Sequence, residues 1–399
     1  MTRNMVRIGD VCTVVSGSTP KTSVAEYWDG DIKWITPAEL TEDTFYLHDS
    51  VRHITELGKE KTGLTYMPCG TVILSSRAPI GKTAIIACEM CCNQGFKNLI
   101  CSDKIFNEYL YFFLSAKTKY LNSLGRGATF KEISKAIVEN IMIPLPCIEQ
   151  QKQIAARFAQ IDDLIKLRRG QLQQLDQLVK SRFIELFGDP LLDDGRYLKV
   201  PLGTLAEVGS SKRIFEKEYV TEGVPFYRTK EIVELSKGNR ITTELFITRE
   251  RYNEIRDEYG VPQKGDLLIS AVGTIGVIWI VDGKNDFYFK DGNLLRVAAT
   301  EKFAPTYIKH LLEALIGAYK QEMSSGTAYA ALTISALKEM LVYVVPLSEQ
   351  EQFATFVEQT DKLKFAVQNA ADLQIMLILN LANYHWKHRA SVSDKGVKL

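Results

Sequence analysis

Residues 146–188 read PCIEQQKQIAARFAQIDDLIKLRRGQLQQLDQLVKSRFIELFG, and their apolar pattern decides the fold. Repeated over several heptads, steps of three and four predict a long helix that packs one edge on a partner helix. At 1.5 Å per residue, such a helix is about 60 Å long. Arg168 and Arg182 interrupt the edge, as register-setting positions or as a frayed part of it. The apolar edge itself consists of Ile154, Phe158, Ile161, Ile165, Leu172, Leu175, Val179 and Leu186.

The partner helix is predicted from a second copy of this pattern. Residues 346–386 read PLSEQEQFATFVEQTDKLKFAVQNAADLQIMLILNLANYHW. In both copies a proline stops the preceding strand and a Glu-Gln pair suits a helix start, Glu149-Gln150 matching Glu349-Gln350. The second apolar edge is expected to contain Phe353, Phe356, Thr360, Leu363, Val367, Ala370, Gln374, Leu377, Leu381 and Tyr384.

The repetition also covers the segments before each helix. A self-similarity at about 195 to 200 residues indicates a duplicated domain, because solenoid arrays repeat at no more than about 50 residues. The chain is therefore expected to be two copies of a globular domain followed by a long helix. The matching segments are 6–11 with 200–205, 34–40 with 226–232, 70–75 with 265–270, 80–81 with 275–276, and 125–134 with 324–333.

The predicted fold class is α+β, with mostly antiparallel strands because turn residues are dense. The two helices are expected to pack as an antiparallel coiled coil that relates the two domains by an approximate two-fold axis. We expect strands at 71–74, 83–87, 137–145, 267–271 and 277–281, and helices at 106–123 and 307–323. The expected divisions are 1–145 (first domain), 146–188 (helix), 189–195 (linker), 196–345 (second domain), 346–389 (helix) and 390–399 (tail).

The composition narrows the functional classes. A net charge of +1 and a pI of about 7.5 count against a basic nucleic-acid-binding domain, although a local basic cleft remains compatible with them. Neither a membrane span nor a signal peptide is expected, since no run of 18 apolar residues occurs. The cysteines, at positions 12, 69, 88, 91, 92, 101 and 147, have no counterparts in the second copy. This distribution argues against a disulfide framework and indicates a cytoplasmic protein.

The familiar motifs of catalytic and metal sites are missing from the sequence. It contains no GxGxxG, Walker A, HExxH or GxSxG pattern, and the string at Asp189-Pro190 lacks the aromatic motif of base methyltransferases. Cys88, Cys91 and Cys92 lack a second CxxC pair, so zinc is disfavoured. His385 and His388 suit a helix C-terminus better than a metal. Asp29 and Asp31 resemble a nuclease carboxylate cluster only loosely. We therefore expect no catalytic residues and no metal.

The chain resembles the specificity subunit of type I restriction–modification enzymes over nearly its whole length. The similarity rests on the duplicated architecture, on residues 143–151 (IPLPCIEQQ) with their copy 345–350 (VPLSEQ), and on the Gly-Thr type turn before each copy. Those turns are Gly127-Ala128-Thr129 and Gly326-Thr327-Ala328. Ala128 departs from the Thr or Ser that is common there, so Thr129 is the substitute hydroxyl.

The resemblance implies a division of labour among subunits. Each target recognition domain would read one half of a split, asymmetric site in double-stranded DNA, and the helices would set the gap. Two modification (methyltransferase) subunits would dock on the helices, bring S-adenosylmethionine and methylate adenine at N6. Restriction subunits would add ATP- and Mg-dependent translocation and cleavage. This chain would hold no cofactor itself and would contact no membrane.

DNA contacts are expected from side chains in or beside the predicted loops. Basic residues suit phosphates, whereas side chains that carry both hydrogen-bond donors and acceptors suit base edges. The candidates are Lys21, Arg77, Lys82, Lys97, Arg126, Thr129 and Lys131 in the first domain, and Lys212, Arg213, Arg228, Lys230, Thr274, Lys290, Asn293, Thr327 and Tyr329 in the second.

Two other functions are compatible with parts of the sequence. The neutral charge and the Leu-rich helix also fit a coiled-coil scaffold with two protein-binding heads. A stand-alone DNA-modifying enzyme would need an active site, for which the sequence offers no motif. Salt-dependent DNA binding would distinguish the specificity subunit from the scaffold.

Overall fold

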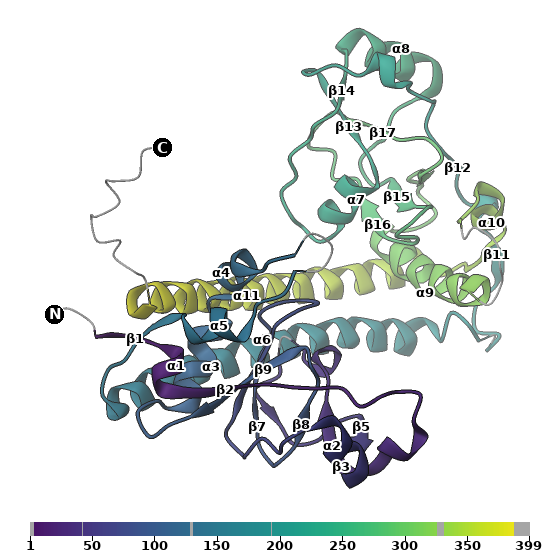
Figure 1. Ribbon diagram of the computed structural model, residues 1–399. Coiled ribbons are helices and arrows are strands. Elements are labelled where there is room, and N and C mark those ends of the chain that lie inside the picture. Colours follow the sequence, from purple (N-terminus) through teal and green to yellow (C-terminus); the bar gives the residue numbers. More distant parts are fainter. Residues whose placement is uncertain (1–3, 42, 128–130, 193, 325–330, 387–399) are drawn as a thin grey trace. The chain divides into compact units, whose positions relative to one another are not determined.

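A computed structural model describes residues 4–41, 43–127, 131–192, 194–324 and 331–386. The chain divides into two compact units (Figure 1). Unit 1 is Met1–Gly170 with Val367–Leu399, and unit 2 is Gln171–Ala366. Each unit therefore combines one globular domain with half of each long helix, so the compact units cut across the linear order of domains and helices.

Unit 1 is built on a five-stranded sheet of order β2-β9-β6-β7-β4 and a three-stranded sheet of order β5-β3-β8. The parallel pairs among the described strands of unit 1 are β4–β7 and β3–β8. The strands are β1 (Met5–Arg7), β2 (Cys12–Ser16), β3 (Trp28–Ile35), β4 (Tyr46–Leu47), β5 (Arg52–Ile54), β6 (Val72–Ser75), β7 (Thr83–Ile86), β8 (Cys91–Cys92), β9 (Phe96–Cys101) and β10 (Met142–Pro144). The helices are α1 (Ile8–Val11), η1 (Ala25–Tyr27), η2 (Pro37–Glu39), α2 (Glu56–Thr62), α3 (Asn107–Ser115), α4 (Thr118–Leu124) and α5 (Lys135–Glu139).

Unit 2 repeats this plan with a sheet of order β12-β18-β15-β16 and a second sheet of order β14-β13-β17. In both units, the first and last strands of the domain pair with each other, as β1–β10 and β11–β19. The strands are β11 (Lys199–Pro201), β12 (Val208–Gly209), β13 (Val224–Tyr227), β14 (Phe246–Ile247), β15 (Leu267–Ser270), β16 (Ile278–Ile280), β17 (Tyr288–Phe289), β18 (Leu294–Val297) and β19 (Leu341–Tyr343). The helices are η3 (Leu202–Thr204), η4 (Glu216–Glu218), α7 (Thr229–Ser236), α8 (Arg249–Tyr259), α9 (Pro305–Ser324) and α10 (Ile334–Glu339).

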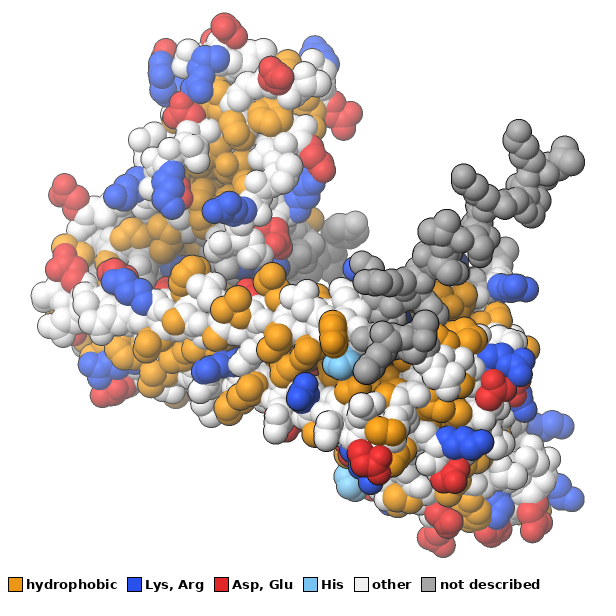
Figure 2. All heavy atoms as spheres, turned by 90° about the vertical axis from the view of Figure 1, so that its left-hand side faces the viewer, with side chains coloured by type: hydrophobic (Ala, Val, Ile, Leu, Met, Phe, Trp, Pro, Cys, Tyr) orange, Lys and Arg blue, Asp and Glu red, His pale blue; other side chains and the backbone are white. Residues whose placement is uncertain are grey.

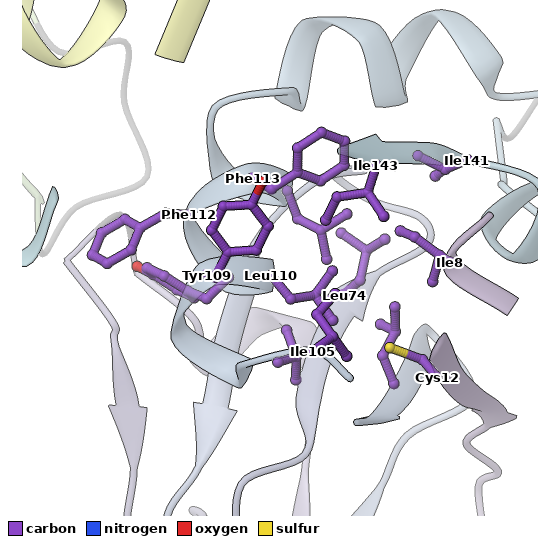
Figure 3. Packing of buried hydrophobic residues seen from close by; sticks show 14 of the residues in the cluster. Ile8, Cys12, Leu74, Ile105, Tyr109, Leu110, Phe112, Phe113, Ile141 and Ile143 are labelled. Carbon is purple, nitrogen blue, oxygen red and sulfur yellow. The ribbon is translucent and has the colours of Figure 1, made fainter. Parts of the chain in front are cut away.

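The two long helices, α6 (Ile148–Phe187) and α11 (Leu347–Trp386), pack antiparallel, as predicted. In unit 1 the ring of Phe158, early in α6, stacks on Trp386 at the end of α11, with centroids 4.7 Å apart. In unit 2 Phe183, late in α6, meets Phe353 at the start of α11, at 5.3 Å. Each helix end thereby joins a domain core. Figure 3 shows the core of unit 1, with Tyr109 and Phe113 of α3 near Ile143 of β10.

The packed edge of α6 agrees with the predicted pattern, and that of α11 agrees at seven of its ten predicted positions. Leu363, Leu377 and Tyr384 were expected on the edge, yet they are exposed by 58, 49 and 70%. At these positions the next residue is half-buried instead, as with Lys364 after Leu363 and Ile378 after Leu377. The prediction was wrong at these three positions, and the apolar run in the second half of α11 supplies a possible stripe on more than one face.

Two smaller predictions also differ from the structure. Residues 106–123 form two helices, α3 and α4. Residues 137–145 do not form one strand: they contain the end of α5 and then β10. Ser134 caps α5 by accepting a hydrogen bond from the Ile137 amide, and the Asn140 side chain closes it on the Ala136 carbonyl. Because Val138 and Ile141 are both buried, their spacing suits a short helix as well as a strand.

The motif that opens each long helix acts through one buried glutamine. The Gln151 side chain accepts a hydrogen bond from the Phe106 amide at 2.8 Å and donates to the Pro146 carbonyl at 2.9 Å. Gln350 accepts from the Ala304 amide and donates to the Val345 carbonyl, both at 2.8 Å. Gln151 is therefore the counterpart of Gln350, and the sequence alignment of Glu149-Gln150 with Glu349-Gln350 was one residue out of register.

Candidate nucleic-acid interface

Loops from three parts of the first domain meet at one end of its sheets. The parallel strands β3 and β8 end side by side, and there the Asn93 amide donates to the Ile35 carbonyl at 2.9 Å. The Asn93 side chain donates to Thr19 Oγ1 at 2.9 Å and accepts from the Gly95 amide at 2.7 Å. One asparagine thus fixes the loop after β2 to the loop after β8.

A tight turn after β6 is attached to the same cluster. Ser75 Oγ donates to the Pro79 carbonyl at 2.7 Å and accepts from the Lys82 amide at 2.8 Å. Gly81 adopts a positive φ of 102°, which favours glycine at this position. The backbone of Ser76 bonds to Gly95 and to Ile133. The turn is therefore held between the loop after β8 and the segment that precedes α5.

The second domain repeats this construction with different side chains. Ser270 Oγ accepts from the Val277 amide at 2.9 Å, and Gly276 has a φ of 86°. The Ala271 amide donates to the Asn293 carbonyl, and the Ala271 carbonyl accepts from the Leu332 amide. The repeated Ile-Gly pairs in the sequence therefore mark two equivalent turns at equivalent loop clusters.

Some basic candidates of the first domain are accessible to a ligand, whereas others are already bonded to groups of the protein. Lys21, Arg126 and Lys131 are exposed, and Arg77 is half-buried with no ion pair among the described residues. The Lys82 ammonium donates to the Leu40 carbonyl instead. Lys97 is only 6% exposed, and its ammonium lies 3.2 Å from Glu132. Lys97 therefore supports the loop cluster from inside and is not placed to meet a phosphate.

In the second domain, carboxylates occupy most of the candidate cations. Arg228 lies 3.1 Å from Glu231 and 3.2 Å from Glu244, which also accepts from Lys230 at 2.9 Å. Hydrogen bonds from Lys230 and then from Arg228 lower the pKa of Glu244. Hydrogen bonding to Glu231 raises the pKa of Arg228, so this cluster stays ionised at neutral pH.

The remaining second-domain candidates lie on the loops of the cluster. Arg213 and Lys290 both approach Asp291, at 2.9 and 3.6 Å. Lys212 lies over the ring of Tyr259 at 4.6 Å. Thr274 and Asn293 are exposed. Thr129, Thr327 and Tyr329, together with Ala128, lie outside the described residues.

Sequence reasoning missed the residues that organise the cluster. Asn93 was overlooked because asparagine after a strand is common, although its counterpart at the end of the matching strand, Lys290, was selected. After β3 and after β13, a glutamate accepts a hydrogen bond from the backbone amide three residues earlier, Glu39 from Thr36 and Glu231 from Arg228, both at 2.8 Å. The spacing between the first residue after a strand and a glutamate three positions later is the sequence feature that could have located these loops.

The long helices leave apolar side chains exposed to solvent. We call this set the apolar helix surface. Figure 2 shows exposed hydrophobic side chains, in orange, on the face of the molecule that it presents. Helix α11 is also long and apolar enough to cross a membrane, by length and composition only. This is weak evidence for a membrane span, because α11 packs on α6 in both units. The set comprises Leu164, Leu167, Leu178 and Ile184 on α6, and Leu363, Phe365, Leu373, Ile375, Met376, Leu377, Leu379 and Tyr384 on α11.

Within the described ranges, no group of three or more His, Cys, Asp or Glu residues is arranged to hold a metal. All seven cysteines are free thiols. Cys91 and Cys92 are buried, and burial raises the pKa of Cys91 to about 11, so this thiol is protonated at neutral pH. His388 lies outside the described residues, so the expectation that His385 and His388 suit a helix C-terminus better than a metal stays a prediction.

Comparison with known proteins places this geometry in context. The family model described as type I restriction modification DNA specificity domain matches residues 2–177 and 197–375. The MjaIX type I restriction enzyme specificity subunit of Methanocaldococcus jannaschii is 36% identical over 262 residues, which cover 60% of this chain and 60% of that protein. The MjaVIII specificity subunit of the same organism is 24% identical, covering 90% of this chain and 86% of its own.

Solved structures share the fold at low sequence identity. A specificity subunit from M. genitalium aligns with a TM-score of 0.56 and 14% identity, covering 97% of both chains. A chain from a study of complex assembly and conformational transition in a type I restriction–modification system aligns with a TM-score of 0.60 and 19% identity. That alignment covers 96% of this chain and 97% of the other.

Proposed function

Because the chain belongs to the family of type I restriction–modification DNA specificity proteins, we propose that it selects the DNA sequence for such a complex and has no active site of its own. The observation that carries this proposal is the duplicated loop cluster, built on Ser75 in one unit and on Ser270 in the other. Each cluster reads one half of a bipartite site. The halves differ because the side chains on the two clusters differ.

The accessible cations of the clusters would contact phosphates and fix the position of the duplex. Lys21, Arg126 and Lys131 serve the first half-site, and Lys212 serves the second. Exposed Thr274 and Asn293 carry the donors and acceptors that base edges require. Arg77 and Arg228 stand beside the turns and contribute to one half-site each. Thr129, Thr327 and Tyr329, which lie outside the described residues, belong to the same proposal.

The apolar helix surface would be the docking site for two modification subunits. A stripe containing Leu373, Met376 and Leu379 is costly to leave in water, and large exposed apolar patches mark interaction sites. The modification subunits would supply S-adenosylmethionine for adenine-N6 methylation. Restriction subunits would supply ATP- and Mg-dependent translocation and cleavage, and the assembly would work in the cytoplasm without contacting a membrane.

A methylation map tests the proposal directly. The chain is co-expressed with its modification subunit in a host that lacks other adenine methylation, and N6-methyladenine is located across the genome. We expect a motif with two unlike halves and a fixed gap. If a complex co-purifies but no bipartite motif emerges, the proposal fails.

Substitution of one arginine then tests the assignment of one half-site to each domain. Arg77→Ala should relax sequence selection in one half of the motif and leave the other half intact. Arg228→Ala should do the reverse. Equal relaxation of both halves by either variant would contradict the assignment.

The scaffold function remains a second candidate because the net charge is only +1 and the apolar helix surface is large. Counterion release distinguishes the two candidates. A DNA-reading protein loses affinity for DNA steeply as salt rises from 50 to 200 mM, by about a factor of ten for every two or so phosphate contacts. A scaffold would show no saturable DNA binding at either salt concentration.

A further inference from the structure

A cavity of about 290 Å³ lies in the second domain beside the loop that carries Lys212. Its walls come from segments far apart in the sequence: the residues after β12, the end of α8 and the strands β17 and β18. The side chains that give it chemical character are Lys212, Tyr259, Tyr288 and Arg296. Two cations and two phenol rings therefore line one pocket.

One wall of the cavity carries a largely buried guanidinium with unused donors. Arg296 is 22% exposed, and its Nε donates to Asp266 at 2.6 Å. Asp266 is 1% exposed and also accepts from the Gln263 and Ala299 amides. An arginine has five N–H donors, and within the described residues only the Nε contact of Arg296 has a hydrogen-bond partner. The other donors are free to bind an acceptor in the cavity.

A second cation, on the loop after β12, has no carboxylate partner. Lys212 Nζ lies 4.6 Å from the centre of the Tyr259 ring, and no described carboxylate approaches it within ion-pair distance. The Lys212 backbone is fixed because its amide donates to Tyr288 Oη at 2.7 Å. Tyr259 is 47% exposed, so its ring is accessible at the mouth. Together, the ammonium and ring suit a ligand that has both an anion and a flat apolar surface.

At the matching sheet position of the first domain, an asparagine stands in place of Arg296. Arg296 pairs with Leu268 and Gly209 in its sheet, as Asn98 pairs with Ile73 and Val15. Asn98 is fully buried, and both polar atoms of its side chain lack partners among the described residues. A Cβ added to Gly209 would meet nothing within 4 Å. The second domain thus replaces a closed amide and a valine with an arginine and open space.

We propose that this cavity is a nucleotide-binding pocket, with a phosphate held by Lys212 and Arg296 and a base resting against Tyr259. Charge-assisted hydrogen bonds from Arg and Lys hold phosphate oxygens. Any of the four bases can stack on an aromatic side chain, because every base has a flat π-face. The nucleotide comes either from the bound duplex or from solution as a free nucleoside monophosphate. The duplex source rests on the proposed DNA-reading function, whereas the free source does not.

The variant Gly209→Val, which adds bulk on the strand position paired with the cavity-lining Arg296, tests the proposal on the full chain. Gly209 has an extended backbone and open space at Cβ, so valine should fit without loss of the fold, which a thermal melt verifies. Lys212→Met removes the mouth cation, and Lys217→Met, an exposed lysine of the same domain, is the matched control. The probes are deoxyguanosine monophosphate, deoxyguanosine and inorganic phosphate by calorimetry, and a duplex of about 40 base pairs by fluorescence anisotropy.

We expect saturable binding of the monophosphate, weaker binding of its two parts, and a loss of about tenfold or more in Gly209→Val and Lys212→Met but not in Lys217→Met. Competition between monophosphate and duplex identifies the duplex as the source, whereas unchanged duplex affinity in Gly209→Val identifies the free nucleotide. A tenfold loss of duplex affinity without monophosphate binding also supports the pocket. If Gly209→Val changes neither, the proposal is overturned. The monophosphate measurement stands even if no DNA motif is found.

Discussion

At the scale of single residues, the two buried glutamines at the starts of the long helices each bond a backbone amide and a backbone carbonyl that precede the helix. Gln151→Leu would leave the Phe106 amide and the Pro146 carbonyl without their side-chain partner in a closed site. An unsatisfied buried polar group costs about 1–3 kcal/mol. We therefore expect Gln151→Leu to lower the free energy of unfolding by at least that amount in urea denaturation.

The neighbouring Gln150 provides the control for this prediction. It is exposed, so Gln150→Leu should change the unfolding free energy by less than about 0.5 kcal/mol. The same comparison can be made with Gln350→Leu and the exposed Gln352→Leu in the second helix. Similar losses from Gln150→Leu and Gln151→Leu would contradict the assigned contacts.

A second residue-scale prediction concerns the carboxylate that occupies Arg228 and Lys230. Glu244→Gln removes the charge of one of the two carboxylates near Arg228 and Lys230. It leaves Lys230 only its longer contact with Glu231, at 3.6 Å, so the ammonium is more available to a phosphate. We expect a two- to fivefold gain in affinity for the cognate duplex at low salt. The slope of log affinity against log salt should steepen by about 0.9 for each added phosphate contact. Fluorescence anisotropy from 50 to 200 mM salt measures both.

Glu250→Gln, on an exposed position of α8, is the matched control and should leave the affinity and slope unchanged. Because hydrogen bonds lower the pKa of Glu244, its pairs are complete at neutral pH and are lost only as the pH falls through that lowered value. The comparison therefore belongs at pH 7. An unchanged slope in Glu244→Gln would mean that Arg228 and Lys230 do not face DNA.

At the scale of elements, the helix α11 carries a face for which the chain itself provides no cover in the described residues. Leu373 and Met376 are 66 and 58% exposed. Replacing both with glutamate should leave the thermal midpoint of the isolated chain nearly unchanged, because neither side chain is buried. The same change should weaken association with the modification subunit by about 100-fold or more, since it places charges in an apolar interface.

Asn383→Glu is the control, because Asn383 is an exposed polar residue on the same half of α11. It adds charge without removing apolar surface, and pull-down or sedimentation should detect a normal complex. If the glutamate pair leaves the complex intact but the chain loses affinity for lipid vesicles, the apolar helix surface would be a membrane-binding face instead.

The elements also show what the sequence could predict and why the rest needed the structure. Helix α6 was predictable because Phe158, Ile165 and Val179 recur against a polar background. The packed edge of α11 was predictable only in part, because the run from Leu373 to Leu381 places apolar residues on several faces and propensity cannot choose among them. Lys97 was misplaced for a similar reason: a lysine in a β-strand is usually exposed, and only the position of Glu132 shows that this one is paired inside.

At the scale of the whole molecule, each compact unit combines a domain with parts of both long helices. Unit 1 gains Trp386 from the far end of the chain, which packs with Tyr109 and Phe158. Unit 2 places Phe183 and Phe187 from the end of α6 on Phe353 and Tyr307. The sequence order of domain and helix therefore does not describe the folding units, since a residue 277 positions away completes a core.

This division shows where the helices can be lengthened without disturbing either core. A seven-residue insertion between Gly170 and Gln171, matched by one between Ala366 and Val367, falls at the boundary of the units in both helices. Seven residues add about 10 Å of helix and preserve the heptad register. If the helices measure the gap between half-sites, the methylated motif should widen by about three base pairs, at about 3.4 Å per step.

An insertion in α6 alone is the informative control. It would shift α6 against α11. The contact of Lys364 with Asp176, 2.7 Å apart, could then not coexist with contacts on the other side of the insertion, such as that of Phe158 with Trp386. We expect that variant to lose methylation altogether, whereas the double insertion keeps it with a wider gap. An unchanged gap in an active double-insertion variant would show that the helices do not set the spacing, and the loop clusters would then have to measure the distance themselves.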